Sequence, residues 1–302
     1  MIRYLKRKEL NEQKYNACIE KSIQSNVYAY SWYLDIVAEN WAVLILNDYE
    51  AVMPLPFKQK YFIKYVYPPF WMLHLGVFSL TKRSSSDDFL EVLFKKFRFS
   101  ELRMNPKNNF HKFSSVLVEK QMQFLSLKEE YDVIYSGYNR NRKRELQTAK
   151  NEGLIEKWND HPENLIQLFK NNVAQKVKNI VEQDLSVLLK LIKVSVEKGV
   201  GEVLSIYDKN NNLVASAFFL KNKNAVDVLV CSTDFKNRKN GANTFFNDRA
   251  IFKYRKDFEI YNFGGSSIKP IAKHYKSYGA NTETYNLIVY NNLPFLFRIF
   301  KR

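Results

Sequence analysis

Hydrophobic residues recur along the chain with periods of about two and about 3.6 residues, which indicate strands and helices respectively. In the first half, the expected strands lie near Ile2 to Leu5, Trp41 to Leu46, Ala51 to Phe57, Tyr61 to Val66, Phe99 to Met104 and Ser114 to Val118, and the expected helices near Glu9 to Lys21, Trp32 to Glu39 and Asp87 to Phe97. Residues 67–70 contain two prolines that lack the amide hydrogen of a central strand, so a rigid loop is expected there.

The second half has the same kind of order. A strand or two is expected before Ser136, followed by a helix from Gly137 to Glu152. The remaining expected strands are Leu154 to Trp158, Glu202 to Tyr207, Leu213 to Leu220, Ala225 to Cys231, Phe258 to Phe263 and Thr284 to Tyr290, and the helices are Pro162 to Ala174, Asp184 to Glu197, Ala242 to Tyr254 and Ile268 to Tyr278. Helices on mostly antiparallel sheets, twice over, predict an α+β protein with domains of residues 1–122 and 123–302. The length of 302 residues agrees, because a single core seldom grows so large.

Composition and charge narrow the class of protein. Hydrophobic residues make up 46% of the chain, which argues against a disordered or fibrous protein. The chain has 47 Lys and Arg against 31 Asp and Glu, a net charge of +16. This excess suits an anionic partner such as nucleic acid, a phosphorylated metabolite or an anionic membrane surface, but it equally suits lysines spread over a solvated surface.

Cysteines and targeting signals add little. Cys18 and Cys231 lie far apart without a Cys or His cluster, so neither a metal site nor a disulfide is predicted. The N-terminus lacks the apolar core of a signal peptide, and no apolar run reaches the ~20 residues of a transmembrane segment. We therefore expect a cytoplasmic protein. The basic, Phe-rich segment from Leu293 either packs on its own domain or makes weak contact with a membrane surface.

The helix expected over residues 137–152 places an arginine on its inward face. Arg142 lies at helical spacing from Tyr138, Leu146 and Ala149. Arg140 and Arg144 lie on an adjoining face, where they can bind phosphate or carboxylate groups. Two interpretations stay open: these arginines bind a substrate, or the segment is a solvated helix end with Arg142 paired to a core carboxylate.

Two glycine-containing segments follow later in the chain. Residues 238–243, Arg-Lys-Asn-Gly-Ala-Asn, lead into a helix whose exposed amides and positive end suit a pyrophosphate, although an ordinary helix cap explains the same residues. Residues 263–266, Phe-Gly-Gly-Ser, end an apolar strand and precede a short helix that contains Tyr275 and Tyr278.

Taken in order, these segments resemble the FemABX-like branch of the GNAT N-acyltransferase superfamily over nearly the whole chain. Residues 142–153 are similar to the family's basic helix, and residues 263–266 with 275–280 to its Asp-Phe-x-Gly-Ser and Phe-Gly-Ala pair. In the first half, Met53-Pro-Leu-Pro56 and residues 69–78 resemble two further motifs. Asn262 stands where the family has aspartate, so no carboxylate base is expected there, and Asn243 stands where GNAT enzymes have a small residue.

The resemblance implies two tandem GNAT-like domains and transfer of an acyl or aminoacyl group to an amine. It implies no tightly bound cofactor and no metal, with acyl-CoA or aminoacyl-tRNA as co-substrate. Tyr275 matches a tyrosine acid of many GNAT enzymes and is expected to protonate the leaving group. The residues expected to bind the donor, including the backbone amides for the oxyanion, are Val230, Cys231, Arg238, Gly241, Ala242 and Asn243.

On the acceptor side, residues from both halves are expected to bind a phosphorylated small molecule or a peptidoglycan precursor. They are Arg140, Arg142, Arg144, Tyr67, Trp71, His74, Gly265 and Ser266. The leading hypothesis is an acyl- or aminoacyltransferase that forms an amide on a nucleotide-sugar or cell-envelope amine, with tRNA as a further partner. Arg142→Ala is then expected to reduce activity far more than stability. The alternative hypothesis is a noncatalytic GNAT-like module that binds RNA or an anionic glycan through a basic cleft, as suggested by Asn243 and Asn262.

Overall fold

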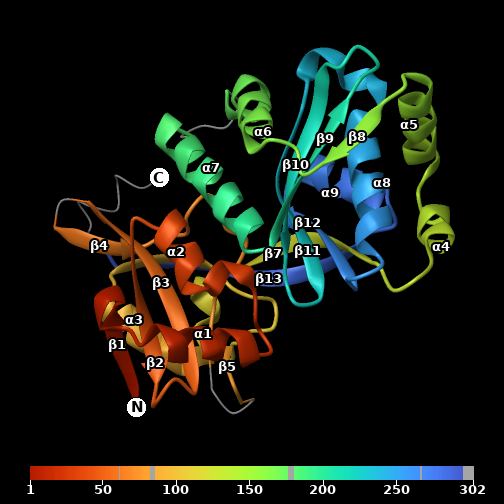
Figure 1. The fold of residues 1–302 in the computed structure, drawn as a ribbon. Coiled ribbons are helices and arrows are strands. Elements are labelled where there is room, and N and C mark those ends of the chain that lie inside the picture. The colour runs from red at the N-terminus through yellow and green to blue at the C-terminus, as the bar shows by residue number, and fades with distance from the viewer. Residues whose placement is uncertain (61, 82–85, 176–179, 266, 295–302) are drawn as a thin grey trace. The chain divides into compact units, whose positions relative to one another are not determined.

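The structure, a computed structural model, describes residues 1–60, 62–81, 86–175, 180–265 and 267–294. The chain is an α+β protein with a mixed sheet flanked by helices (Figure 1). Its contacts divide it into two compact units, one of Met1–Lys120 with the segment from Thr284 onward, and one of Gln121–Glu283. The domain division after residue 122 that the sequence suggests stays a prediction.

The first unit is a sheet in the strand order β1-β2-β3-β4-β6-β13, with β5 paired to β3. All neighbouring pairs are antiparallel except β4 and β6, which are parallel. Its strands are β1 (Ile2–Lys6), β2 (Asn40–Leu46), β3 (Ala51–Lys60), β4 (Ile63–Val66), β5 (Phe78–Ser79), β6 (Phe99–Arg103) and β13 (Asn281–Asn291), and its helices are α1 (Glu12–Lys21), α2 (Ser31–Val37) and α3 (Ser86–Lys96).

Two prolines lie inside β3, where a central strand would not tolerate them. Pro54 and Pro56 are in register with residues of β2. On the other edge of β3, β5 pairs with residues 51 and 52 and β4 pairs from residue 57 onward. The ladders on that edge therefore stop on either side of the prolines, which have no amide hydrogen to donate.

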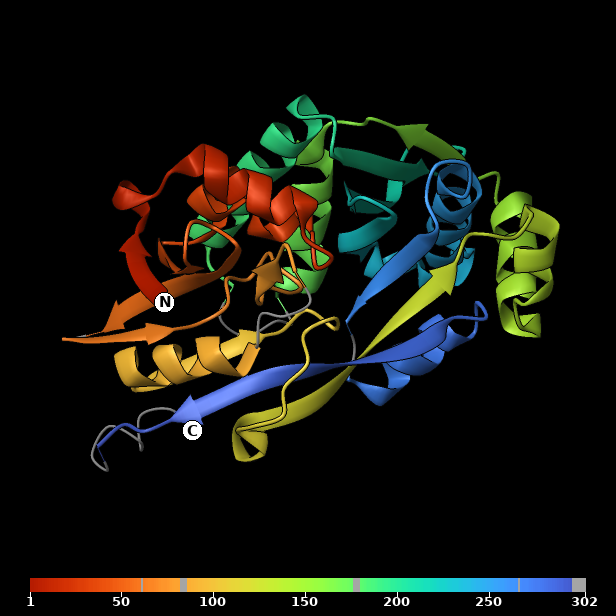
Figure 2. The same ribbon diagram turned by 90° about the horizontal axis from the view of Figure 1, so that it is seen from below.

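Helix α3 supplies much of the first unit's core. Phe89, Leu90 and Leu93 are buried, and they cluster with Leu44 and Leu102 of the sheet. Figure 2 shows α3, in orange, alongside the strands it covers. The apolar face of this helix was predictable, because its buried residues recur at helical spacing.

The second unit is a sheet in the order β7-β12-β11-β10-β9-β8. Its strands are β7 (Leu117–Ser126), β8 (Ile155–Trp158), β9 (Gly201–Tyr207), β10 (Leu213–Lys221), β11 (Ala225–Thr233) and β12 (Ile260–Gly265), and its helices are α4 (Tyr131–Ser136), α5 (Arg140–Asn151), α6 (Pro162–Phe169), α7 (Glu182–Glu197), α8 (Ala242–Tyr254) and α9 (Lys269–Lys276). Helices α6 and α7 cover one face of β9 and β10, and α8 covers the other (Figure 1).

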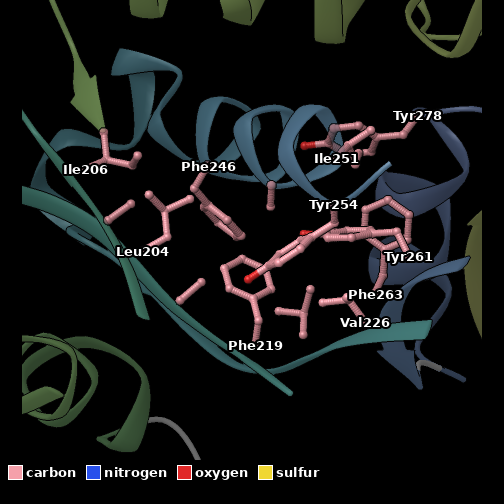
Figure 3. Packing of buried hydrophobic residues seen from close by; sticks show 14 of the residues in the cluster. Leu204, Ile206, Phe219, Val226, Phe246, Ile251, Tyr254, Tyr261, Phe263 and Tyr278 are labelled. Atoms are coloured by element: carbon pink, nitrogen blue, oxygen red, sulfur yellow. The ribbon is translucent and has the colours of Figure 1, made fainter. Parts of the chain in front are cut away.

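The core of this second unit lies beneath α8. Phe246 and Tyr254 of that helix are buried, and they pack with Leu204, Phe219 and Tyr261 of the sheet (Figure 3). The Phe219 and Tyr254 rings lie 5.4 Å apart in an edge-on arrangement that aromatic pairs prefer. This core fixes α8 against the strands, and α8 in turn positions the site described below.

Strand β7 of the second unit precedes Ser136, as expected. Residues 131–136 form helix α4, which the sequence did not predict; its Tyr131 packs on Phe252 of α8 and donates a hydrogen bond to Asp248 at 2.7 Å. The sheet is mostly antiparallel, as expected, and β11 and β12 are the one parallel pair among the described strands of this unit. A strand, helix and strand in succession give a parallel pair, and α8 is the crossover helix here.

The expected domain boundary after residue 122 falls inside strand β7, which begins after a short 3-10 turn at Ser114–Val116. The strand expected near Ser114 to Val118 therefore starts later than predicted. Within the described part of the chain, no helix combines the length and the apolar character needed to cross a membrane.

Candidate functional site

The two parallel strands β11 and β12 pair over only a short distance. Their register covers Ala225 to Asp227 against Ile260 to Asn262, although β11 continues to Thr233. Beyond this point β11 carries a bulge against β10, since Val228 and Val230 face successive residues of β10 and Leu229 is left over. A bulge bends its strand and increases the local twist, so it turns β11 away from its regular course.

The end of β12 is bent as well. The Asn262 side chain accepts a hydrogen bond from the Gly264 amide at 3.0 Å, and Gly264 adopts a positive φ of 82°. Such a backbone conformation suits glycine, because a side chain would be strained there. Asn262 therefore braces this turn through its side-chain oxygen.

A pocket of about 330 Å³ lies beside the diverging ends of β11 and β12. Strands β11 and β12, the first turns of α8 and the helix α9 all contribute to its wall. Its lining consists of Val228, Cys231, Asn243, Phe246, Asn247, Phe263, Pro270, Ile271, His274 and Tyr275. Three residues expected at the site, Cys231, Asn243 and Tyr275, are thus brought together although they are spread over 45 positions of sequence.

Tyr275 packs flat on Phe263 in this wall, with ring centroids 4.8 Å apart and an interplanar angle of 23°. Burial, followed by the influence of Cys231 and Tyr278, raises the pKa of Tyr275 above its ordinary value of 10.0. The phenol therefore keeps its proton at neutral pH. No described residue forms a hydrogen bond with its hydroxyl, so the O–H group is available to form one with a molecule in the pocket.

His274 and Asn243 form a polar pair in the same wall. The Nε2 atom of His274 lies 3.2 Å from Oδ1 of Asn243. Burial, and then the positive charge of Arg142, lowers the pKa of His274 to about 4, so the imidazole is neutral at physiological pH. Sequence reasoning did not place His274, Asn247 or Phe263 in the site, because their proximity depends on three different elements.

Arg142 is buried, as the helical spacing predicted, with 7% of its surface exposed. Its guanidinium bonds to Glu145 at 2.8 Å and to the Thr244 hydroxyl at 2.6 Å, and Thr244 in turn donates to Glu145. The guanidinium also lies over the Tyr278 ring at 5.5 Å. These contacts match the interpretation in which Arg142 is paired with a carboxylate. Its role in substrate binding stays a prediction.

Arg140 and Arg144 are exposed on α5, and among the described residues neither lines the pocket. Arg238 is also exposed, and its guanidinium lies 3.7 Å from the centre of the Phe235 ring. It borders a second hollow of about 570 Å³ beside Lys236 and Lys239. The structure therefore places the exposed basic groups outside the pocket that holds Tyr275.

Val230, Gly241 and Ala242, three residues expected to bind the donor, are buried by packing. Gly241 has a φ of 79°, and a Cβ atom there would lie 2.2 Å from the carbonyl oxygen of Glu145. The glycine is needed because α8 begins against the backbone of α5. Gly265 ends β12 in register with Met122, and Ser266 lies outside the described residues.

The remaining predicted residues, Tyr67, Trp71 and His74, belong to the first unit. The Trp71 carbonyl accepts a hydrogen bond from the Tyr33 hydroxyl, and the Tyr67 amide donates to the Pro56 carbonyl at 3.2 Å. His74 is buried, and burial followed by the charge of Arg103 lowers its pKa to about 3. Its ring meets that of Tyr285 edge-on at 4.7 Å. These contacts hold Tyr67, Trp71 and His74 in fixed positions. Their role in binding stays a prediction.

Comparison with known proteins gives matches in structure. No protein-family profile matches the chain, and no curated protein sequence does. The structure is similar to FemX, with a TM-score of 0.66 and 11% identity over 97% of this chain and 99% of that one. It is also similar to the C-terminal domain of a putative lysylphosphatidylglycerol synthetase from Agrobacterium fabrum, with a TM-score of 0.60 and 11% identity over 93% and 91% of the two chains.

A third match is L-PGS from Bacillus licheniformis, with a TM-score of 0.55 and 10% identity over 95% of this chain and 94% of that one. These matches cover nearly the full length of each chain at low identity, so they establish a shared fold. They confirm the resemblance that the basic helix and the Gly-Gly-Ser segment suggested. The chain therefore has the fold of the FemABX/GNAT-type acyltransferases.

Proposed function

We propose that the protein is an acyl- or aminoacyltransferase that forms an amide on the amine of a nucleotide-sugar, a peptidoglycan precursor or another cell-envelope intermediate. One observation carries the proposal. Strands β11 and β12 diverge beside a pocket lined by Tyr275, whose hydroxyl has no partner among the described residues. The fold shared with FemX supports the same reaction class.

The proposed chemistry needs few groups. The acceptor amine attacks the donor carbonyl, a C–N bond forms, and the carbonyl electron pair moves onto oxygen. When the tetrahedral intermediate collapses, the C–S bond of a thioester or the C–O bond of an aminoacyl ester breaks. Tyr275 gives its proton to the departing sulfur or oxygen, and the proton lost by the amine restores the phenol.

Backbone amides of β11 are the proposed donors to the oxyanion. The register with β12 ends at Asp227, so the amides farther along this edge of β11 have no strand partner from β12. Val230 and Cys231 follow the bulge at Leu229 and lie in this stretch. Backbone amides held by a strand are already oriented, and for that reason they stabilise a developing negative charge efficiently.

The two units are, in this proposal, tandem GNAT-like domains, of which the second binds the donor. The donor is acyl-CoA or aminoacyl-tRNA. Arg238 and the loop before α8 are proposed to bind the phosphates of the donor, because this loop follows β11 and leads to the pocket wall at Asn243.

The test is an amide-formation assay on the full chain. Acetyl-CoA, longer acyl-CoAs and aminoacyl-tRNAs are each combined with UDP-linked muropeptides and amino-sugar nucleotides, and products are detected by mass spectrometry. Thermal shift with each donor reports binding separately from turnover. We expect an amide product with at least one donor. The absence of both an amide product and a thermal shift with every donor would contradict the proposal.

A second candidate function is a noncatalytic module that binds RNA or an anionic glycan. It is favoured by the exposed Lys236, Arg238 and Lys239, which gather beside one hollow, and by Asn243, whose side chain occupies the pocket wall. A salt titration separates the candidates. RNA affinity that falls steeply with salt, combined with no thermal shift from any thioester, supports this second function.

A further inference from the structure

The pocket beside Tyr275 has an uncharged wall. Among the described residues that line it, none is Asp, Glu, Lys or Arg. Three lining groups can ionise, and each is neutral at pH 7. Burial raises the pKa of the Cys231 thiol to about 11 and that of Tyr275 still further, while it lowers the pKa of His274 to about 4. A charged group that entered this pocket would therefore meet no ionised partner in its wall.

The oxygen atoms of the two asparagines in the wall are already engaged. Oδ1 of Asn247 accepts from the Tyr261 hydroxyl at 3.0 Å, and Oδ1 of Asn243 lies 3.2 Å from His274. The Asn243 carbonyl accepts from the Asn247 side chain at 2.9 Å. An ammonium group has three donors to satisfy and no acceptor, so it would lose its water without gaining equivalent partners.

Positive potential adds to this effect. Asn243, Phe246 and Asn247 belong to the first turns of α8, whose N-terminus carries a partial positive charge. The positive charge of Arg142 also acts on His274 in the pocket wall and, after burial, contributes to lowering the pKa of that imidazole. Glu145 offsets part of this charge but does not line the pocket.

We propose that the pocket accepts an uncharged acyl group and discriminates against an acyl group that bears an α-ammonium, so that the donor is an acyl thioester rather than an aminoacyl ester. This inference rests on the proposed acyltransferase function and selects between its two donor classes. The selecting residues are Asn243, Asn247 and His274, which supply polarity without negative charge.

Propionyl-CoA and glycyl-CoA provide a matched test, because their acyl groups have the same number of heavy atoms and differ in a methyl against an ammonium. With an α-amino pKa of about 7.7–8.0, roughly a tenth to a sixth of glycyl-CoA is uncharged at pH 7, so we expect its kcat/KM to be about six- to elevenfold lower than that of propionyl-CoA. The ratio should approach unity above about pH 9, where nearly all of the α-amino group has lost its proton. Because both donors share one acceptor amine, its own ionisation cancels from the ratio.

Asn243→Asp introduces a carboxylate at the pocket wall with little change in volume. This variant should lower the ratio of kcat/KM for propionyl-CoA to kcat/KM for glycyl-CoA, because the ammonium group of glycyl-CoA then has an ionic partner. Asn151→Asp, at the exposed end of α5, makes the same charge change outside the pocket lining and should leave the ratio unchanged. If Asn243→Asp does not fold, the comparison of the two thioesters on the unaltered protein decides by itself.

Equal use of glycyl-CoA and propionyl-CoA would overturn this inference and leave the acyltransferase function standing. So would an amide product obtained with aminoacyl-tRNA alone. Failure of both thioesters and of aminoacyl-tRNA to give any amide would overturn the proposed function together with the inference.

Discussion

Gly241 lies against the main chain of Glu145 so closely that a Cβ atom on Gly241 would stand 2.2 Å from the Glu145 carbonyl oxygen. Helix α8 therefore starts where α5 leaves no space for a side chain. This contact connects the basic helix to the pocket, because Asn243 in the first turn of α8 lines the pocket and Thr244 bonds to Arg142.

Gly241→Ala should destabilise the protein by more than its backbone conformation alone explains. Gly199 is the matched control, because it has a similar φ of 71° but nothing within 4 Å of the position of a Cβ atom. We expect Gly199→Ala to cost about 1 kcal/mol and Gly241→Ala at least about 2 kcal/mol more, measured by urea unfolding. Equal losses for the two variants would show that the contact with Glu145 relaxes freely.

Arg142→Ala should reduce stability as well as any activity. The substitution leaves the Glu145 carboxylate, one-third exposed, and the buried Thr244 hydroxyl without their shared partner. We expect a loss of about 1–3 kcal/mol in the free energy of unfolding. Arg144→Ala, on an exposed position of the same helix, should stay within about 0.5 kcal/mol. An Arg142→Ala protein of unchanged stability and abolished activity would instead assign this arginine to the substrate.

Tyr275→Phe should lower turnover with little effect on stability. It removes a hydroxyl that has no partner among the described residues and keeps the ring that stacks on Phe263. Loss of a general acid typically costs about 10²–10⁴ in rate, which an amide-formation assay under saturating donor detects. Tyr135→Phe, outside the pocket lining, is the control and should retain full activity. Wild-type turnover by Tyr275→Phe would assign the proton to another donor.

Stability should fall as the pH is lowered from about 6.5 toward 4. The pKa of His274 is lowered in the folded protein to about 4 from an ordinary value of 6.5, so between these limits the unfolded chain binds a proton that the folded chain does not. His74, with a pKa of about 3, acts in the same direction. Above about pH 6.5 both histidines are neutral in the folded and the unfolded chain, so no stability is lost there. Below this pH each histidine lowers the free energy of unfolding by at most about 1.4 kcal/mol per pH unit.

Urea midpoints measured between pH 4.5 and 7 test this dependence. His274→Gln keeps a polar side chain without a titratable group, so its stability should depend less steeply on pH than that of the wild type. An identical slope in both proteins would mean that His274 does not titrate differently on unfolding.

The local periodicity of the sequence determined several elements closely. Helix α8 runs over the predicted residues 242–254, and β10 and β11 differ from their predicted bounds by at most two residues at either end. Arg142 is buried because its spacing of seven residues from Ala149 places both on one face of helix α5. Each of these features depends on neighbours within a few turns of chain, and such neighbours are readable in sequence order.

The sequence contained weaker signals for which residues these elements contact in the folded chain. Glu145 stands three residues after Arg142, a spacing that favours an ion pair, but Thr244 is 102 residues away and nothing in the sequence links it to the arginine. Helix α4 was not predicted, because its six residues are too few for helical periodicity to show and its contact with α8 is formed only in the folded chain.

The amino-acid sequence by itself determined the fold and most helices and strands, and it predicted a role for Tyr275. Only the tertiary structure decided that β11 and β12 diverge, that Asn243 and His274 meet Tyr275 around one pocket, and that the exposed arginines lie outside it. The physical reason is the range of the interactions. Hydrophobic periodicity acts between residues close in the chain, whereas a bulge, a parallel strand pair and an uncharged pocket arise from contacts between elements that folding alone brings together.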